Sequence, residues 1–186
     1  MKKALIIIDI QNDYFEGGRK TLVGADKASL NAKAVLHDCR KDNIPVIHVQ
    51  HINDREGARF FLPGTTGIDI HENVKPIDGE KIIIKHWPNS FRETELLAYL
   101  NSLEIKELVI CGMMTHMCID TTVRAANDLG FINLLIGDAC ATLDLEIEGR
   151  KINAANVHYA FLAALNGSFA KVVTAEEYLN KTYLYS

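Results

Sequence analysis

The sequence has no closely spaced pair of cysteines and no long apolar run, and each absence excludes a class of protein. Its four cysteines are widely spaced and form no C-x-x-C pair, a pattern typical of neither a disulfide framework nor a zinc finger. The first apolar run extends only from Ala4 to Ile8 before Asp9 interrupts it, which is too short for a membrane span or a signal-peptide core. These features predict a cytoplasmic protein.

The chain also lacks an excess of one charge and any segment rich in Gly, Ser or Pro. Its net charge is −4, with acidic and basic residues interspersed, so nucleic acid and membrane are not expected partners. A length of 186 residues, with 48% hydrophobic and 24% charged residues, is ordinary for one globular domain. We therefore predict a single domain spanning residues 1–186.

Strand-like and helical segments alternate along the chain. Short apolar runs are typical of strands buried on both faces, and they occur at residues 5–8, 45–49, 82–84, 108–111, 133–136 and 171–173. Helical spacing of apolar residues falls between them, at 28–39 with Asp26 as cap, at 96–103 after a capping box from Ser90 to Glu93, at 119–129 before Gly130, and at 152–162. This alternation predicts an α/β fold whose parallel sheet is covered by helices on both faces.

One long segment, residues 52–80, interrupts the alternation. It holds four glycines together with Phe60, Phe61 and Leu62. A long loop with exposed apolar residues serves as a lid, a binding loop or a subunit contact, and the sequence leaves these three open. Because such a patch is often buried against another copy, we expect a homodimer or a higher homo-oligomer.

Three chemically reactive residues follow predicted strands. Asp9 ends the first strand, Lys85 ends the third, and Cys118 lies just past the fourth, where a helix begins. Ligands of an open parallel sheet bind beyond the carboxyl ends of its strands. A helix N-terminus and an ammonium group both favour a thiolate, so we expect the pKa of Cys118 to lie below the free value of about 8.5. Asp9 would take the thiol proton and Lys85 would hold Asp9 in place.

Taken singly, each of these residues has a common structural explanation. An Asp after a strand often caps a turn, a Lys there is usually solvated, and a Cys opening a helix is usually inert. The surrounding motifs change the balance: Asp9-Ile-Gln11-Asn-Asp13-Tyr-Phe15, Lys85 followed by Ser90-Phe91 and Thr94, Pro63-Gly64-Thr-Thr-Gly67, Gly112-Met-Met-Thr115-His-Met-Cys118, and Gly137-Asp138-Ala139. From Ala4 to about Leu179 the chain resembles the isochorismatase-like cysteine hydrolases.

The resemblance implies a fold and a catalytic site. The implied fold is a three-layer α/β/α, Rossmann-like structure with a doubly wound six-stranded parallel sheet. The implied triad is Asp9, Lys85 and Cys118, and a cis peptide would join Met113 to Met114. Such a bond would direct the N–H of Met114, with that of Cys118, at a developing oxyanion.

Departures from family patterns narrow the expected chemistry. Nicotinamidases carry an Asp-x-His metal motif after the second strand, whereas this chain reads His48-Val-Gln-His51-Ile-Asn-Asp54. His48 and His51 are three residues apart, which places them on opposite faces of a strand. We therefore expect no metal and no cofactor. The sequence is closer to the amide-cleaving, streptothricin-hydrolase-like branch, since isochorismatases proper lack the nucleophilic cysteine.

The predicted function is hydrolysis of a C–N bond in a small amide or cyclic amide through a thioester. The alternatives are a thiol-based redox sensor and a catalytically silent assembly subunit on the same fold. The expected partner is therefore a small-molecule substrate, but the identity of the physiological substrate does not follow from the sequence. Four residues are candidates for the wall of the substrate pocket: Gln11, Phe15, Trp87 and His116.

Overall fold

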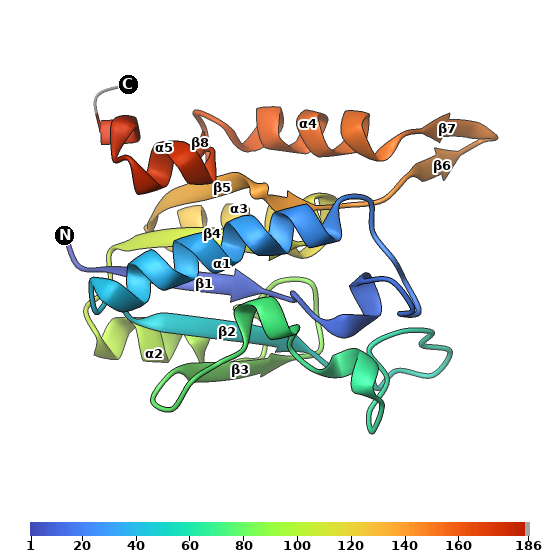
Figure 1. The fold of residues 1–186 in the computed structure, drawn as a ribbon, viewed down its shortest axis with the longest axis horizontal. Helices are drawn as coiled ribbons and strands as arrows, with labels where there is room; N and C mark the ends of the chain where they lie inside the picture. The colour runs from blue at the N-terminus through green and yellow to red at the C-terminus, as the bar shows by residue number, and fades with distance from the viewer. Residues whose placement is uncertain (185–186) are drawn as a thin grey trace.

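A wholly parallel six-stranded sheet organises the chain (Figure 1). The structure, a computed structural model, describes residues 1–184. The strands, in the order they lie in the sheet, are β3 (Lys81–Lys85), β2 (Val46–His51), β1 (Lys3–Ile8), β4 (Glu107–Met113), β5 (Ile132–Ala141) and β8 (Lys171–Val173). The predicted doubly wound, six-stranded parallel sheet is confirmed.

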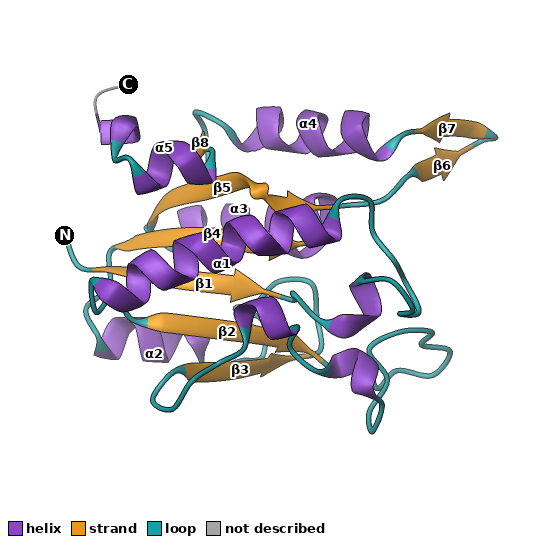
Figure 2. Cartoon of the chain, in the orientation of Figure 1, coloured by secondary structure: helices purple, strands orange, loops and turns teal. Residues whose placement is uncertain are grey.

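Helices cover both faces of the sheet (Figure 2). One face packs against α1 (Ala25–Lys41) and α5 (Ala175–Leu179), and the other against α2 (Leu96–Ser102), α3 (Asp120–Asp128) and α4 (Ala154–Leu165). Short 3-10 turns are η1 (Asn12–Tyr14), η2 (Thr66–Ile68), η3 (Glu72–Val74) and η5 (Thr182–Leu184), and η4 (Thr115–Ile119) is a π-helical turn. Within residues 1–184, no helix is both long and apolar enough to cross a membrane.

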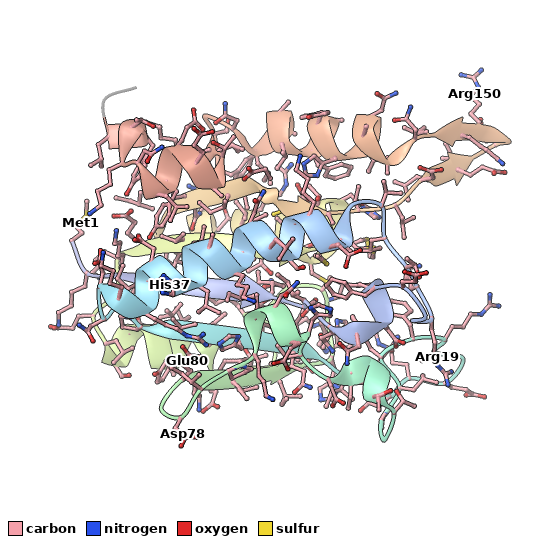
Figure 3. All side chains as sticks on the ribbon, viewed as in Figure 1. Met1, Arg19, His37, Asp78, Glu80 and Arg150 are labelled. Carbon is pink, nitrogen blue, oxygen red and sulfur yellow. The ribbon has the colours of Figure 1, made fainter. Side chains whose placement is uncertain are left out.

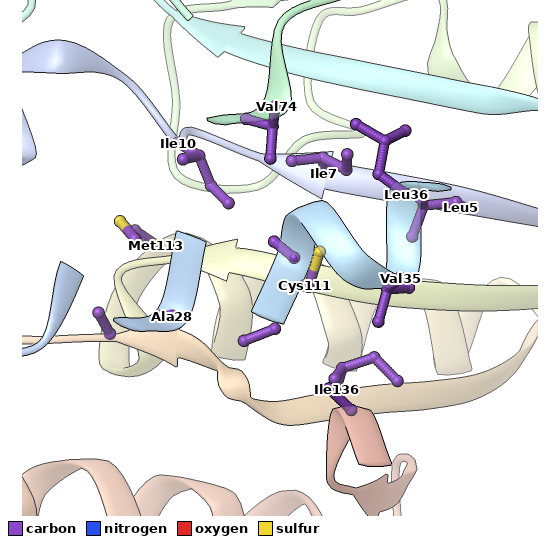
Figure 4. Packing of buried hydrophobic residues seen from close by; sticks show 14 of the residues in the cluster. Leu5, Ile7, Ile10, Ala28, Val35, Leu36, Val74, Cys111, Met113 and Ile136 are labelled. Carbon is purple, nitrogen blue, oxygen red and sulfur yellow. The ribbon is translucent and has the colours of Figure 1, made fainter. Parts of the chain in front are cut away.

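The central strand β1 contributes to a separate core on each side of the sheet. Leu5 and Ile7 pack under α1 with residues such as Val35 and Cys111 (Figure 4). Ala4, Ile6 and Ile8 pack on the opposite side, against α2 and α3. Because neighbouring residues of a strand point to opposite faces, a strand covered on both faces is apolar throughout. This explains why the run from Ala4 to Ile8 has no polar residue until Asp9.

The strand order reverses between β1 and β4, which are neighbours in the sheet. From β1 the chain winds outward to β2 and β3, then returns to β4 and winds the other way. A crevice at the carboxyl ends of the strands forms at such a switch point. At this place Gly112 allows β4 to approach β1 closely, since a Cβ atom there would lie 2.0 Å from the carbonyl oxygen of Ile8.

Three predicted helix starts are wrong. Helix α1 begins at Ala25 after Gly24, and the Asp26 side chain caps nothing. Helix α2 begins only at Leu96, because Ser90 lies in a turn and its hydroxyl and backbone N–H bond Thr122 of α3. At α2 the capping pattern is present locally, but the contact of Ser90 with α3 determines where the helix begins.

The third error concerns the segment before α4. Ile152 belongs to a small antiparallel hairpin of β6 (Leu145–Ile147) and β7 (Arg150–Ile152), and α4 begins at Ala154 with Asn153 as its cap. Arg150 projects from the tip of this hairpin (Figure 3).

Two residues expected on buried helix faces are exposed instead, Tyr159 by 70% and Leu129 by 45%. Strand β5 also runs past its predicted end, although Asp138 still accepts a hydrogen bond from the first N–H of α5, as a cap does.

Candidate active site

The structure brings Asp9, Lys85 and Cys118 together at the strand ends. Asp9 directly follows β1, Lys85 is the last residue of β3, and Cys118 lies in the π-helical turn after β4. The Lys85 Nζ atom lies 2.7 Å from the Asp9 Oδ2 atom, and both side chains are fully buried. A carboxylate oxygen of Asp9, a ring nitrogen of His51 and the sulfur of Cys118 all lie within 4.8 Å of one another.

The Asp9–Lys85 ion pair keeps two opposite charges inside the protein. Burial acts to lower the pKa of Lys85, but the charge and hydrogen bond of Asp9, together with those of Cys118, outweigh burial, so the pKa lies above its ordinary value. Lys85 also donates a hydrogen bond to the carbonyl oxygen of Pro88 at 3.0 Å, which anchors the loop that leaves β3. The ammonium group is therefore permanently charged and fixed beside the carboxylate.

The expected lowering of the Cys118 pKa is wrong for the resting site. Burial and the charge of Asp9 raise the pKa of Cys118 to about 12, and the charge of Lys85 opposes this only in part. The sequence indicated the helix start and the ammonium but not the depth of burial, and the side chain of Cys118 is only 4% exposed. At neutral pH Cys118 is thus a thiol, so a base has to take its proton when it attacks.

Alkylation of Cys118 by iodoacetamide is accordingly expected to be slow at neutral pH. Its rate should rise about tenfold per pH unit between pH 7 and 9, because only the thiolate reacts. Asp9→Asn should accelerate labelling and Lys85→Ala should slow it, since the two charges act on the pKa of Cys118 in opposite directions. Peptide-mapped labelling rates of the wild type and the two variants, at several pH values, measure these effects. Cys39 and Cys140, with pKa values raised by burial to about 11 and about 12, provide internal references. Rapid labelling of Cys118 independent of pH would contradict the burial argument.

His51 belongs to the site but is absent from the predicted triad and pocket. As the last residue of β2 it is paired in register with Lys85, and β2 lies between β1 and β3. The backbone of His51 is held at both polar groups, because the Gln11 amide accepts from its N–H at 2.8 Å and donates to its carbonyl at 2.9 Å. Burial lowers the pKa of His51 to about 4, against the raising effect of Asp9. The imidazole is therefore neutral at physiological pH.

The turn that carries Cys118 is fastened to the neighbouring strand and helix. The peptide bond between Met113 and Met114 is cis. Thr115 donates a hydrogen bond to the carbonyl of Ala141 at 3.2 Å and also bonds His158 Nδ1 of α4 at 2.9 Å. Since the hydroxyl has one proton, His158 Nδ1 is the donor to Thr115. His158 thus holds the turn in place from α4.

The four predicted pocket residues have different surroundings. The Gln11 amide is engaged by backbone groups of His51 and Ile68, so it clamps the site rather than facing a substrate. Phe15 stacks on His71 at 3.6 Å in the core. Trp87 is half-buried, with Arg55 and Arg92 over its ring and its N–H donated to Glu93. His116, two residues before Cys118, is half-buried and bonds Thr142 at 2.5 Å.

Phe60, Phe61 and Leu62 of the 52–80 loop do not form an exposed patch. Phe61 is fully buried, Phe60 and Leu62 are half-buried, and the ring of Phe61 lies 4.7 Å from that of Tyr14 and 5.8 Å from that of His51. The Phe61 N–H donates to the Asp13 carboxylate at 2.5 Å. The loop is therefore a wall of the site, held by Asp13.

One group of side chains in residues 1–184 has the composition of a metal site. Asp9, His51 and Cys118 offer oxygen, nitrogen and sulfur within 4.8 Å of one another, which suits a borderline-soft cation. Asp9 already has the Lys85 ammonium at 2.7 Å, and a cation there would meet that charge. His48 is elsewhere, bonded to Glu80 at 2.8 Å, so the two histidines do not form one site.

Activity is expected to survive exhaustive treatment with EDTA. The reason is that Lys85 supplies the positive charge beside Asp9 that a metal would otherwise bring. Turnover before and after chelation, with zinc added back, tests this. Loss of turnover with EDTA and its recovery with zinc would assign a catalytic metal to Asp9, His51 and Cys118.

Comparison with known proteins supports the assignment that the geometry indicates. The family model described as the isochorismatase domain matches residues 3–177. The chain belongs to the isochorismatase family. YddQ of Bacillus subtilis, an uncharacterized member, is 50% identical over 179 residues, covering 96% of this chain and 99% of its own length. An isochorismatase hydrolase from Oleispira antarctica has a crystal structure with a TM-score of 0.93 and 46% identity, covering 96% of each chain. Streptothricin hydrolase of Streptomyces noursei is 31% identical over 143 residues, covering 77% of this chain and 51% of that protein. The protein is a hydrolase of this family.

Proposed function

We propose that the protein cleaves a C–N bond of a small amide or cyclic amide through a thioester on Cys118. The observation that carries this proposal is the buried pair of Asp9 and Lys85, 2.7 Å apart, beside the sulfur of Cys118. A nucleophile, a base and a fixed positive charge are the parts that covalent amide hydrolysis requires. The 31% identity to streptothricin hydrolase and the 26% identity to nicotinamidase 3 of Arabidopsis thaliana agree with this chemistry.

In the first half of the reaction, Asp9 takes the thiol proton while the sulfur attacks the carbonyl carbon. The resulting oxyanion is stabilised by the N–H groups of Met114 and Cys118, which we assign as the oxyanion hole. Asp9 then gives its proton to the amide nitrogen, the C–N bond breaks, and the amine leaves. The products of this half are an amine and a thioester between the substrate acyl group and Cys118.

In the second half, water replaces the amine. Asp9 takes a proton from the water, whose oxygen attacks the thioester carbon, and the C–S bond breaks. The sulfur regains a proton from Asp9, which releases the carboxylic acid and restores the resting thiol. The raised pKa of Cys118 suits this cycle, since the resting thiol keeps its proton until a carbonyl is in place.

A panel of small linear and cyclic amides tests the proposal, with release of ammonia or amine measured for the wild type and for Cys118→Ala. Hydrolysis of an amide by the wild type, with none by Cys118→Ala, supports the proposal. Full turnover by Cys118→Ala would end the covalent mechanism. Wild-type inactivity toward the whole panel, together with a failure of Cys118 to form any acyl adduct, would favour the silent assembly subunit.

The redox-sensor alternative has less support from the geometry. Oxidation by peroxide follows thiolate character and exposure, whereas Cys118 is 4% exposed and its pKa is raised to about 12. That alternative also gives no role to the buried Asp9–Lys85 pair. The hydrolase mechanism gives a role to Asp9 and to Lys85.

We also propose that the protein forms at least a homodimer. The Phe60–Leu62 segment no longer supports this, but exposed apolar side chains occur elsewhere: Val23 is 62% exposed and Tyr159 is 70% exposed, and both line one surface depression with Ala155. Light scattering at micromolar concentration is expected to give at least twice the chain mass, and Tyr159→Glu should reduce it. A monomeric wild type would refute the proposal.

A further inference from the structure

His51 has hydrogen-bonding capacity that the protein itself does not use. The imidazole is buried, with 8% of the residue exposed. In residues 1–184 the only polar contact of its ring is the 3.9 Å approach of Nδ1 to Asp9 Oδ2, which is too long for a hydrogen bond. Buried polar groups in folded proteins nearly always have a partner, so the open position here is one that a water or a substrate atom would fill.

The open position lies where the reacting atoms have to be. The His51 ring nitrogen, the Asp9 carboxylate and the Cys118 sulfur lie within 4.8 Å of one another. Asp9 is the group that exchanges protons in both halves of the proposed reaction. A separation of 3.9 Å between Nδ1 and the carboxylate is the distance at which one oxygen or nitrogen atom can contact both.

His51 is also held more rigidly than packing alone requires. The Gln11 side chain bonds both its N–H and its carbonyl, while Phe61 packs near its ring at 5.8 Å. A residue that only filled space at the end of β2 could be leucine, which carries no polar atom to leave unpaired. A buried imidazole with an unused nitrogen has a desolvation cost that a leucine avoids.

We propose that His51 orients the water that hydrolyses the acyl-enzyme, and that in the preceding half-reaction it contacts the leaving nitrogen at the same place. This inference rests on the proposed function. In the hydrolytic step the water donates one proton toward Asp9, which becomes protonated, and hydrogen-bonds His51 Nδ1 in the orientation that points its oxygen at the thioester carbon. The C–O bond forms, the C–S bond breaks, and the proton on Asp9 returns to the sulfur. His51 neither gains nor loses a proton in the cycle.

The neutral state of His51 suits this role. A neutral imidazole has one N–H donor and one acceptor nitrogen, so it can bond a water in either orientation. Because burial holds the ring neutral, its hydrogen-bonding does not change across the physiological pH range. Lys85 supplies the fixed positive charge of the site, so His51 does not need to carry one.

The test uses 4-nitrophenyl acetate, which separates the two halves of the reaction. Its nitrophenolate leaves without being protonated, so transfer of the acetyl group to Cys118 is independent of His51, and only the water step tests the inference. The burst of nitrophenolate measures acylation, and intact-protein mass spectrometry measures the lifetime of the acetyl-enzyme. His51→Leu should leave the burst unchanged and lengthen that lifetime at least about tenfold, and His51→Asn, which keeps a polar atom near the position of Nδ1, should recover part of the loss.

His48→Leu is a matched control on the same strand. His48 is also buried, but its ring bonds Glu80 and is not part of the group formed by Asp9, His51 and Cys118. This variant should be less stable and yet hydrolyse its acetyl-enzyme at the wild-type rate. An unchanged lifetime in both His51→Leu and His51→Asn would overturn the role of His51. Absence of a burst in the wild type, or a burst that survives in Cys118→Ala, would instead overturn the covalent mechanism.

Discussion

Cys118→Ala is expected to lose turnover on any amide that the wild type hydrolyses, by on the order of 10³-fold or more. The substitution removes the atom that forms the thioester, and no other cysteine can replace it. Cys39, Cys111 and Cys140 are buried in α1, β4 and β5. Because the Cys118 side chain is small and α3 begins after it at Asp120, the fold should tolerate alanine, and unchanged circular dichroism would show that it does.

The same experiment tests whether the three residues act as a unit. Asp9→Asn should also lose most activity, since an amide cannot take the thiol proton. The double variant of Asp9 and Cys118 should be little worse than either single variant, because each loss already ends the covalent route. Losses that multiplied in the double variant would mean that Asp9 and Cys118 contribute independently, which a shared proton transfer does not allow.

The triad could be predicted from the sequence because each member follows a strand that is easily recognised. Apolar β-branched runs mark β1 and β3, and the rule for strand ends then selects Asp9 and Lys85. His51 was missed because the strand that it ends is longer than its apolar pattern indicates. The apolar pattern of β2 ends at Val49, but pairing with β3 extends the strand to His51. Strand pairing is a tertiary property, and the local pattern does not contain it.

Two other errors also arise from contacts between distant segments. Phe61 was expected on an exposed loop but is buried, because Asp13 accepts its N–H across 48 positions of sequence. The pKa of Cys118 was expected to be low because the sequence shows a helix start and a lysine. The structure adds burial and the proximity of Asp9, and these two effects are the largest. The sequence identifies which charged groups come close together, but not how far each group is desolvated in the folded protein.

The stability of the site depends on the same ion pair as its chemistry. Lys85→Met is expected to lower the free energy of unfolding by about 3–5 kcal/mol, the usual cost of leaving a buried charge without its partner. The methionine fills much of the same volume, but Asp9, which is 0% exposed, would keep its carboxylate in a site without a counter-ion. Urea unfolding at neutral pH, with the slope compared between variants, measures this change.

The matched control is Lys81→Met on the same strand. Lys81 also has a carboxylate at 2.7 Å, that of Glu95, but the two side chains are 30% and 62% exposed. A solvated pair contributes about 0–1 kcal/mol, so this variant should unfold close to the wild-type midpoint. Equal losses in the two variants would show that burial of the Asp9–Lys85 pair has no special energetic consequence.

The double variant Asp9→Asn with Lys85→Met separates stability from function. Removing both charges should recover much of the stability lost by Lys85→Met, because no unpaired buried charge remains. The interaction energy from this double-mutant cycle reports the coupling of the pair directly. Part of the loss should persist, since methionine cannot replace the hydrogen bond from Lys85 to Pro88. Activity should stay absent, because neither asparagine nor methionine can move the thiol proton. A double variant that is folded and inactive would show that this fold retains a buried ion pair for catalysis, at a position where neutral side chains still support folding.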